Sequence, residues 1–149
     1  RLVMAPYGML QSLLSDADLD AALAAAARVL SRGGMLGIDL VPDLPRWQEY
    51  QRHVSLEGPM RGGRRVMLIE SVRQDRRRRL TIFNQEFVER HGRERAVHRF
   101  SLAFRTVTVP EVARRLECAG FTVDAVLGDY RGEEWSSEAD VWVVIARRK

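Results

Sequence analysis

The feature that most constrains the fold is a strand, a capped helix and a second strand within the first 41 residues. A short apolar strand at residues 2–5 ends at a Pro-Tyr-Gly turn. Ser15, with Asp18 three residues later, forms a capping box, and apolar residues then recur at helical spacing until a Gly-Gly pair stops the helix. Residues 35–41 are almost continuously apolar, as in a strand covered on both faces. The segment therefore predicts a parallel crossover unit, which is typical of α/β proteins.

Between residues 42 and 107 the pattern changes from a crossover unit to antiparallel strands. Three runs with strand-like alternation cover residues 65–73, 80–90 and 96–107, and charged turns separate them. They predict a three-stranded antiparallel meander. The residues before these runs are expected to be irregular, apart from a possible short helix at residues 46–50.

A second capped helix and two strands close the chain. Thr108 begins a further capping box with proline in the first turn, and a glycine ends the helix at residue 120. Cys118, near the end of this helix, is expected to be a small core residue. Strands at residues 121–127 and 141–146 are expected to rejoin the sheet that the first strands begin.

Composition excludes several classes of protein. A chain of 149 residues with 46% hydrophobic residues can bury a core, so wholesale disorder is excluded. A single cysteine excludes a disulfide scaffold and is consistent with a reducing compartment, so we expect a cytoplasmic protein. No apolar run approaches the ~20 residues of a membrane span, and no membrane partner is expected.

The net charge of +4 is weak evidence for a nucleic-acid partner. It comes from 24 cationic residues, all arginine except Lys149, interspersed with 20 acidic ones. The local exception is the run Arg76–Arg79, which is a solvated turn or, alternatively, a phosphate-binding patch. The balance favours the solvated turn, and nucleic acid is not the expected partner.

Three short motifs, in this order, resemble the second half of a class I S-adenosylmethionine-dependent methyltransferase. They are Leu-Ser-Arg-Gly-Gly at residues 30–34, Leu-Glu-Cys-Ala-Gly-Phe at 116–121 and Val-Trp-Val-Val-Ile-Ala-Arg at 141–147. The resemblance implies an α/β fold with a partial Rossmann-like sheet that lacks its first strands. Residues 1–149 would form the C-terminal part of one methyltransferase domain, and residues 42–107 would be its substrate-covering insertion.

The resemblance implies transfer of a methyl group from the cofactor S-adenosylmethionine to a nitrogen or oxygen of a small molecule. The family holds this cofactor in a glycine-rich loop between a strand and a helix, and neither Gly33–Gly34 nor Gly58–Gly63 has that setting. The chain begins at Arg1 within a strand, so we expect a longer protein to be the enzyme. The 149 residues alone are expected to be inactive.

Candidate site residues follow the first strand, because ligands of open parallel sheets bind beyond the carboxyl ends of the strands. The resemblance places the methyl donor at Ala5, Pro6 and Tyr7, and the Tyr7 hydroxyl could orient the nucleophile. The alternative is that Tyr7 packs over the strand end. Gln11 could bond the cofactor or substrate, or could cap a turn.

Substrate contacts are expected from Arg46, Trp47, Arg105 and Tyr130. Arg46 and Trp47 form a substrate wall or, alternatively, part of the small core of a lid. Arg105 binds an anionic group of the substrate or forms a salt bridge to Glu70 or Glu86 on neighbouring strands. Tyr130 lies in a loop that closes the pocket or is a plain surface turn. His98 is the histidine we would test as a catalytic base, and no metal site is expected.

Two other functions remain open at this stage. The first is a non-catalytic binding or dimerisation module of methyltransferase fold, and the second is an RNA methyltransferase fragment that uses the Arg76–Arg79 turn. In the enzyme hypothesis the meander covers the substrate, and a homodimer through the meander is possible.

Overall fold

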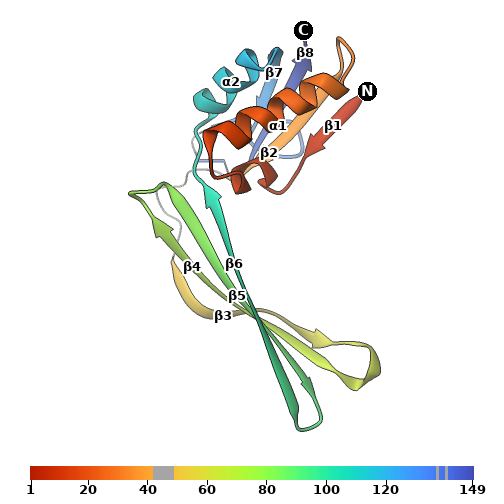
Figure 1. Cartoon of the computed structure of the whole chain (residues 1–149), viewed down its shortest axis with the longest axis vertical. Helices are drawn as coiled ribbons and strands as arrows, with labels where there is room; N and C mark the ends of the chain where they lie inside the picture. The colour runs from red at the N-terminus through yellow and green to blue at the C-terminus, as the bar shows by residue number, and fades with distance from the viewer. Residues whose placement is uncertain (42–48, 137, 140) are drawn as a thin grey trace. The chain divides into compact units, whose positions relative to one another are not determined.

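A computed structural model describes residues 1–41, 49–136, 138–139 and 141–149. The chain divides into two compact units (Figure 1). The first unit comprises residues 1–45 and 104–149, and the second comprises residues 46–103. Residues 46–48 of the predicted short helix at residues 46–50 lie outside the described residues. Glu49 has no regular secondary structure, and Tyr50 begins a strand instead.

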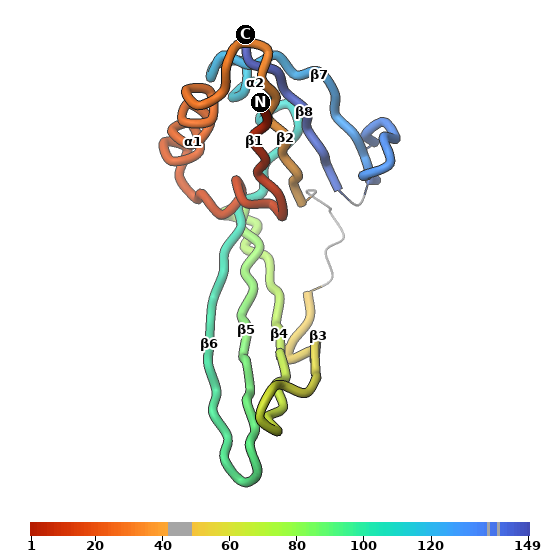
Figure 2. The backbone as a smooth tube through the Cα atoms, turned by 90° about the vertical axis from the view of Figure 1, so that its right-hand side faces the viewer, coloured from red at the N-terminus to blue at the C-terminus, as the bar shows by residue number. Residues whose placement is uncertain are grey.

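The first unit is built on a four-stranded sheet that contains both ends of the chain (Figure 2). Its strand order is β1 (Leu2–Ala5), β2 (Met35–Leu40), β8 (Trp142–Arg148) and β7 (Phe121–Leu127). β1 and β2 are parallel, whereas β8 runs antiparallel to both of its neighbours, β2 and β7. The parallel pair joined by a helix and the return of the last two strands to the same sheet are confirmed.

Two helices pack on one face of this sheet, and both begin at the predicted caps (Figure 1). In α1 (Asp16–Val29) the Ser15 hydroxyl accepts a hydrogen bond from the Asp18 N–H at 3.1 Å. In α2 (Val109–Cys118) the Thr108 hydroxyl accepts one from the Glu111 N–H at 3.3 Å. Each cap satisfies an amide that has no partner within its helix. A 3₁₀ turn, η1 (Met9–Ser12), links β1 to α1.

The core of the first unit lies between these helices and the sheet. Leu36, Ile38 and Leu40 of β2 are each 1% exposed, and they alternate with half-buried residues that face the other side. β2, which is expected to be covered on both faces, is thus fully covered on one face and partly covered on the other. On that other side Met4 of β1 is 62% exposed, and within the described residues no helix packs there.

Cys118 is exposed, so its prediction as a core residue is wrong. The buried side chains of α2 are Val112, Arg115 and Leu116, which recur at helical spacing and define one stripe. Cys118 falls outside that stripe. No described helix has the length and apolar character needed to cross a membrane.

The second unit is a four-stranded antiparallel sheet, so the prediction of three strands is wrong by one. The order is β3 (Tyr50–Pro59), β4 (Arg65–Asp75), β5 (Leu80–His91) and β6 (Glu94–Arg105), each strand lying beside the next in sequence. The additional strand, β3, pairs with β4 through two irregularities in register. A short turn, η2 (Arg61–Gly63), in which Gly62 and Gly63 have positive φ, connects β3 to β4.

Candidate functional site

Three residues that are distant in sequence meet at the carboxyl ends of β1 and β2. The Gly8 amide, just after β1, donates to Oδ1 of Asp39 at 2.9 Å. The Tyr130 hydroxyl, from the loop after β7, donates to Oδ2 of the same carboxylate at 2.8 Å. Asp39 lies near the end of β2 and is half-buried. Both of its oxygens are thus held by donors from other segments, which fixes a negative charge at this edge of the sheet.

Tyr7 projects into solvent beside this carboxylate. It has a φ of 57° and is 89% exposed. A left-handed conformation costs a non-glycine residue roughly 1–2 kcal/mol, and a strained backbone of this kind is often found at functional sites. Gly8 follows with a φ of 62°, and a Cβ added there would lie 2.9 Å from Oε1 of Gln11. The Pro-Tyr-Gly turn therefore presents the Tyr7 phenol away from the core at the strand end.

Gln11 is buried at 3% exposure, and its side-chain amide forms hydrogen bonds with three backbone groups of two residues. Its Nε2 donates to the carbonyls of Val41 and Arg105, at 3.0 and 3.2 Å, while its Oε1 accepts from the Val41 amide at 2.8 Å. Gln11 thus ties its own segment to the chain just after β2 and to the end of β6, and its contact with a cofactor or substrate stays a prediction. Ala5, 3% exposed, can offer a ligand only its backbone, whereas Pro6 is exposed.

The loop that carries Tyr130 is organised by one carboxylate. Oδ1 of Asp129 accepts hydrogen bonds from the amides of Arg131, Gly132 and Glu133 at 2.8 to 2.9 Å. These backbone donors, that of Glu133 first, lower the pKa of Asp129. The hydrogen bond to Asp39, then partial burial, then the charge of Asp39 and the neighbouring Tyr7 raise the pKa of Tyr130.

An open hollow of about 580 Å³ lies in the same loop. Its lining includes Tyr130 and several acidic residues, namely Asp129, Glu133, Glu134 and Glu138. The volume is within the usual range for small-molecule sites. Its carboxylates give the hollow a negative potential, which attracts cations.

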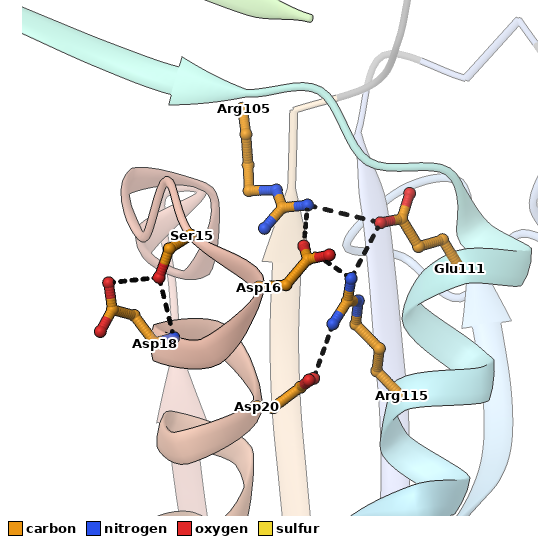
Figure 3. Close-up of polar contacts among 7 residues, drawn as sticks. All are labelled: Ser15, Asp16, Asp18, Asp20, Arg105, Glu111 and Arg115. Atoms are coloured by element: carbon orange, nitrogen blue, oxygen red, sulfur yellow. Dashed lines mark hydrogen bonds and ion pairs between the residues drawn. The ribbon is translucent and has the colours of Figure 1, made fainter.

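Arg105 lies in a cluster of ion pairs and not on an open surface (Figure 3). Its Nη2 is 2.6 Å from Oδ1 of Asp16 and 3.5 Å from Oε1 of Glu111. This is the ion-pair alternative that the sequence offered, but the partners come from the two helices and not from Glu70 or Glu86. Binding of a substrate by Arg105 stays a prediction.

Arg115, on the buried side of α2, is the second arginine of this cluster (Figure 3). Its side chain is 6% exposed, with Nη1 2.7 Å from Oδ1 of Asp20 and Nη2 2.7 Å from Oδ1 of Asp16. The carboxylates of Asp20 and then Asp16 raise its pKa against the opposing effect of burial, so it stays charged. Its Nε and the Nη1 of Arg105 are buried without hydrogen-bond partners, which costs stability. The cluster ties α1 to α2.

The remaining predicted residues are Arg46, Trp47 and His98. Arg46 and Trp47 lie outside the described residues. His98 lies on β6 in the second unit, with Nε2 3.9 Å from Oε1 of Glu89. Its role as a base stays a prediction. Sequence reasoning missed the Tyr130–Asp39 bond; the one signal for it was a lone carboxylate in an otherwise apolar strand.

Comparisons with protein-family models and with curated proteins find no match. Solved structures are similar over 99% of this chain. A S-adenosylmethionine-dependent methyltransferase from Clostridium acetobutylicum ATCC 824 has a TM-score of 0.79 at 11% identity, with 57% of that chain covered. The sugar N-methyltransferase KedS8 from Streptoalloteichus sp ATCC 53650 has a TM-score of 0.77 at 17% identity, with 56% covered.

A third structure is that of CalS10, an amino pentose methyltransferase from Micromonospora echinaspora, determined with S-adenosylmethionine bound. Its TM-score is 0.69 at 20% identity, with 58% of that chain covered. The chain thus has a fold found in S-adenosylmethionine-dependent methyltransferases, and it spans less than three-fifths of the length of each of these structural neighbours.

Proposed function

We propose that this chain is the acceptor-binding part of an S-adenosylmethionine-dependent methyltransferase that acts on a nitrogen or oxygen of a small molecule. The observation that carries the proposal is the polar site of Tyr7, Asp39 and Tyr130 at the carboxyl ends of β1 and β2, in a fold shared with such enzymes. Ligands of open α/β sheets bind at this edge. Catalysis itself is proposed for a longer chain, as the lengths of the structural neighbours suggest.

The described residues fit one side of the cofactor. The turn at residues 5–8 offers backbone atoms and the exposed Tyr7 ring. A glycine-rich loop between a strand and a helix is not found among them: Gly33 and Gly34 follow α1 and precede β2. When bound, S-adenosylmethionine supplies an electrophilic methyl group on a sulfonium. The chain alone is therefore expected to bind this cofactor weakly.

The chain's own residues would orient the acceptor and stabilise charge. The Tyr7 hydroxyl can form a hydrogen bond, as donor or as acceptor, with a substrate placed at the strand ends. That bond would restrict the orientation of the substrate atom that receives the methyl group. Asp39 holds a fixed negative charge beside that position, and such a charge favours the positive charge that develops on an attacking amine. Tyr130 fixes Asp39 and borders the acidic hollow.

The acidic lining of the hollow supports a basic amine as the acceptor in preference to an anion. Asp129, Glu133, Glu134 and Glu138 would attract a protonated amine. Two of the structural neighbours are a sugar N-methyltransferase and an amino pentose methyltransferase, which agrees with this preference. The contributions of Arg46, Trp47 and Arg105 to substrate binding, and of His98 as the base, are part of the same proposal.

The test is an assay of the longest reading frame that contains these 149 residues. Purified protein is incubated with labelled S-adenosylmethionine and a panel of amino sugars and hydroxylated sugars, and transfer of label is measured. The proposal expects turnover with at least one acceptor and a glycine-rich strand–loop–helix segment upstream of Arg1. A frame without that segment, together with no turnover on any acceptor, would reject it.

A further inference from the structure

The strand arginines of the second unit lie on one face of its sheet, here called the arginine face. Residues that pair across β4 and β5 assign each side chain to a face, and alternation along the strands extends the assignment. Arg52 and Arg99 belong to this face because both contact Glu86, which pairs with Ile69. The arginine face carries Arg52, Arg65, Arg73, Arg90, Arg95 and Arg99, whereas the opposite face has no arginine among the described strand residues of the unit.

A bulge in β3 shapes one end of the arginine face. Between the pairs that Tyr50 and His53 form with β4, β3 contains one residue more than β4. Arg52, inside the bulge, has a φ of 52°, which is the left-handed region that is unfavourable for a residue with a Cβ. Its backbone N–H donates to Oγ of Ser71 at 3.0 Å. Bulges and strained backbone of this kind occur next to binding sites, where they redirect a side chain.

An open hollow of about 400 Å³ lies beside the bulge. Its volume is within the usual range for small-molecule sites. Most of its lining residues can donate hydrogen bonds through guanidinium, amide or hydroxyl groups, namely Arg52, Arg73, Gln51, Asn84, Ser71 and Tyr50. The other lining residues are Glu49 and Val72. The hollow therefore offers a ligand many donors and one carboxylate.

Two of these donors, Arg73 and Asn84, are exposed and have no partner. Within the part of the chain that the structure describes, neither side chain forms a hydrogen bond or an ion pair. Arg73 lies two residues along β4 from Ser71, which is about 7 Å on the same face. Because Ser71 contacts the backbone of Arg52, the long side chains of Arg52 and Arg73 can reach one ligand that lies between them.

Three carboxylates lie near these donors, and each already has a partner. They are Glu86, 3.1 Å from Nη1 of Arg52, Glu49, which accepts from the Gln74 amide at 2.7 Å, and Asp75, which accepts from the Arg78 amide at 3.0 Å. A guanidinium has five N–H donors, so Arg52 keeps donors that Glu86 does not use. Arg73 takes part in none of these contacts, and its charge favours an anion in the hollow.

We propose that this hollow binds an oxyanion, as a phosphate or a carboxylate group, between the guanidinium groups of Arg52 and Arg73. A planar guanidinium matches both kinds of group through two parallel hydrogen bonds, and Asn84 adds an amide donor. The strain at Arg52 agrees with this role, because a glycine would fit the left-handed backbone without strain but could not contact the ligand. The site lies within the second unit, and the proposal does not depend on methyl transfer.

The test follows the side-chain amide signals of Asn84 by NMR, in the longest reading frame that contains this chain. The signals are assigned by their absence from an Asn84→Ser variant. Sodium phosphate and sodium acetate are titrated separately at constant ionic strength, so that general screening by salt stays the same. The site predicts a saturable shift with a dissociation constant of about 1 mM or tighter for one of the two anions. The anion that saturates identifies the ligand group as phosphate or carboxylate.

Two matched variants locate the binding. Arg73→Gln and Arg90→Gln each remove one exposed arginine from the same face, but Arg90 lies near the other end of β5 and outside the hollow. Arg73→Gln should raise the dissociation constant by about 10-fold or more, as for a charge-assisted hydrogen bond. Arg90→Gln should raise it by less than about twofold, because salt screens a distant charge.

Arg52→Gly is a second variant if Arg73→Gln does not fold. It removes the guanidinium and the left-handed strain together, and it should weaken binding as Arg73→Gln does. Far-UV circular dichroism confirms that each variant is folded. A shift that saturates with neither anion, or equal weakening by Arg90→Gln and the hollow variants, would overturn the proposal.

Discussion

Two guanidinium groups converge on the carboxylate of Asp16, and this has a consequence for stability in acid. Hydrogen bonds from Arg105 and then Arg115 lower its pKa below the ordinary value of 3.8. A carboxyl whose pKa is lower in the folded state contributes stability above its unfolded pKa and loses it as the pH falls through the folded pKa. The cluster should therefore weaken as the pH falls below about 4.

Asp16→Asn should make the stability of the protein less dependent on pH in acid. The variant cannot lose a charge at this position, so its unfolding midpoint should fall less between about pH 5 and pH 2 than that of the wild type. Urea unfolding at a series of pH values measures this. Glu117→Gln, an exposed carboxylate of α2, is the control and should follow the wild-type profile. Parallel profiles for Asp16→Asn and the wild type would contradict the role assigned to Asp16.

Arg115 supplies the buried cation that the carboxylates of α1 and α2 share. Arg115→Met keeps much of the apolar stem but leaves Asp16, Asp20 and Glu111 with less compensating charge. Breaking a fully buried ion pair lowers the free energy of unfolding by roughly 3–5 kcal/mol. Because water screens the exposed carboxylates of Asp16 and Asp20, we expect Arg115→Met to lower it by about 2 kcal/mol. Urea unfolding at pH 7 measures it. Arg114→Met, on the exposed side of the same helix, should cost much less, and equal losses would contradict the account.

The bond between Tyr130 and Asp39 can be observed by titration. The Tyr130 hydroxyl donates to the Asp39 carboxylate, and this hydrogen bond is the main cause of the raised pKa of Tyr130. Ultraviolet absorbance of the three tyrosines should therefore contain two components that titrate above pH 10, because burial and then the charge of Glu70 also raise the pKa of Tyr50. Asp39→Asn should shift the Tyr130 component to lower pH and Tyr130→Phe should remove it, while the Tyr50 component stays in both variants. An unchanged curve for Asp39→Asn would show that the bond is not formed.

At the scale of elements, the cap of α1 is a local feature with a measurable energy. The Ser15 hydroxyl accepts from the Asp18 amide, so Ser15→Ala should destabilise the protein by about 1 kcal/mol. For a chain of this length the midpoint of thermal unfolding should fall by about 2–4 °C. Ser31→Ala, exposed after the same helix, is the matched control. Equal shifts for the two variants would contradict the capping assignment.

Capped helices and regularly alternating strands were predictable because their signals are local. Both caps form as expected, and β7 has the predicted bounds. β3 was missed because its register shifts between Tyr50 and His53 and again between Val54 and Leu56. Each of these shifts interrupts the two-residue period that identifies a strand. The sequence of this segment therefore did not predict a strand.

The site was predictable only in part, because its contacts join residues far apart in sequence. The strand end at Ala5, Pro6 and Tyr7 follows from the Pro-Tyr-Gly break. The partner of Asp39, Tyr130, is 91 positions away, and Arg115 meets Asp20 across 95 positions. Such contacts depend on how the strands return to the sheet, so a local signal such as the lone carboxylate of Asp39 does not identify the partner residue.

At the scale of the whole molecule, two units have different surfaces suited to different roles. The first unit presents the site of Tyr7, Asp39 and Tyr130 at the carboxyl ends of its parallel strands. The second is a sheet with one apolar and one arginine-bearing face. The proposal of methyl-acceptor binding therefore concerns the first unit.

Replacing Tyr7 in the active protein tests the central claim that the methyl acceptor is bound and oriented at the carboxyl end of β1. In the longest reading frame that contains the chain, Tyr7→Phe should lower kcat for methyl transfer by about 10-fold or more, because it removes the hydroxyl that orients the acceptor. Ser31→Ala, exposed between α1 and β2 and thus at the opposite end of β2, should leave kcat within about twofold of the wild type by the same accounting. If Tyr7→Phe leaves both kcat and KM unchanged, or if Ser31→Ala lowers kcat as much as Tyr7→Phe does, the account is contradicted.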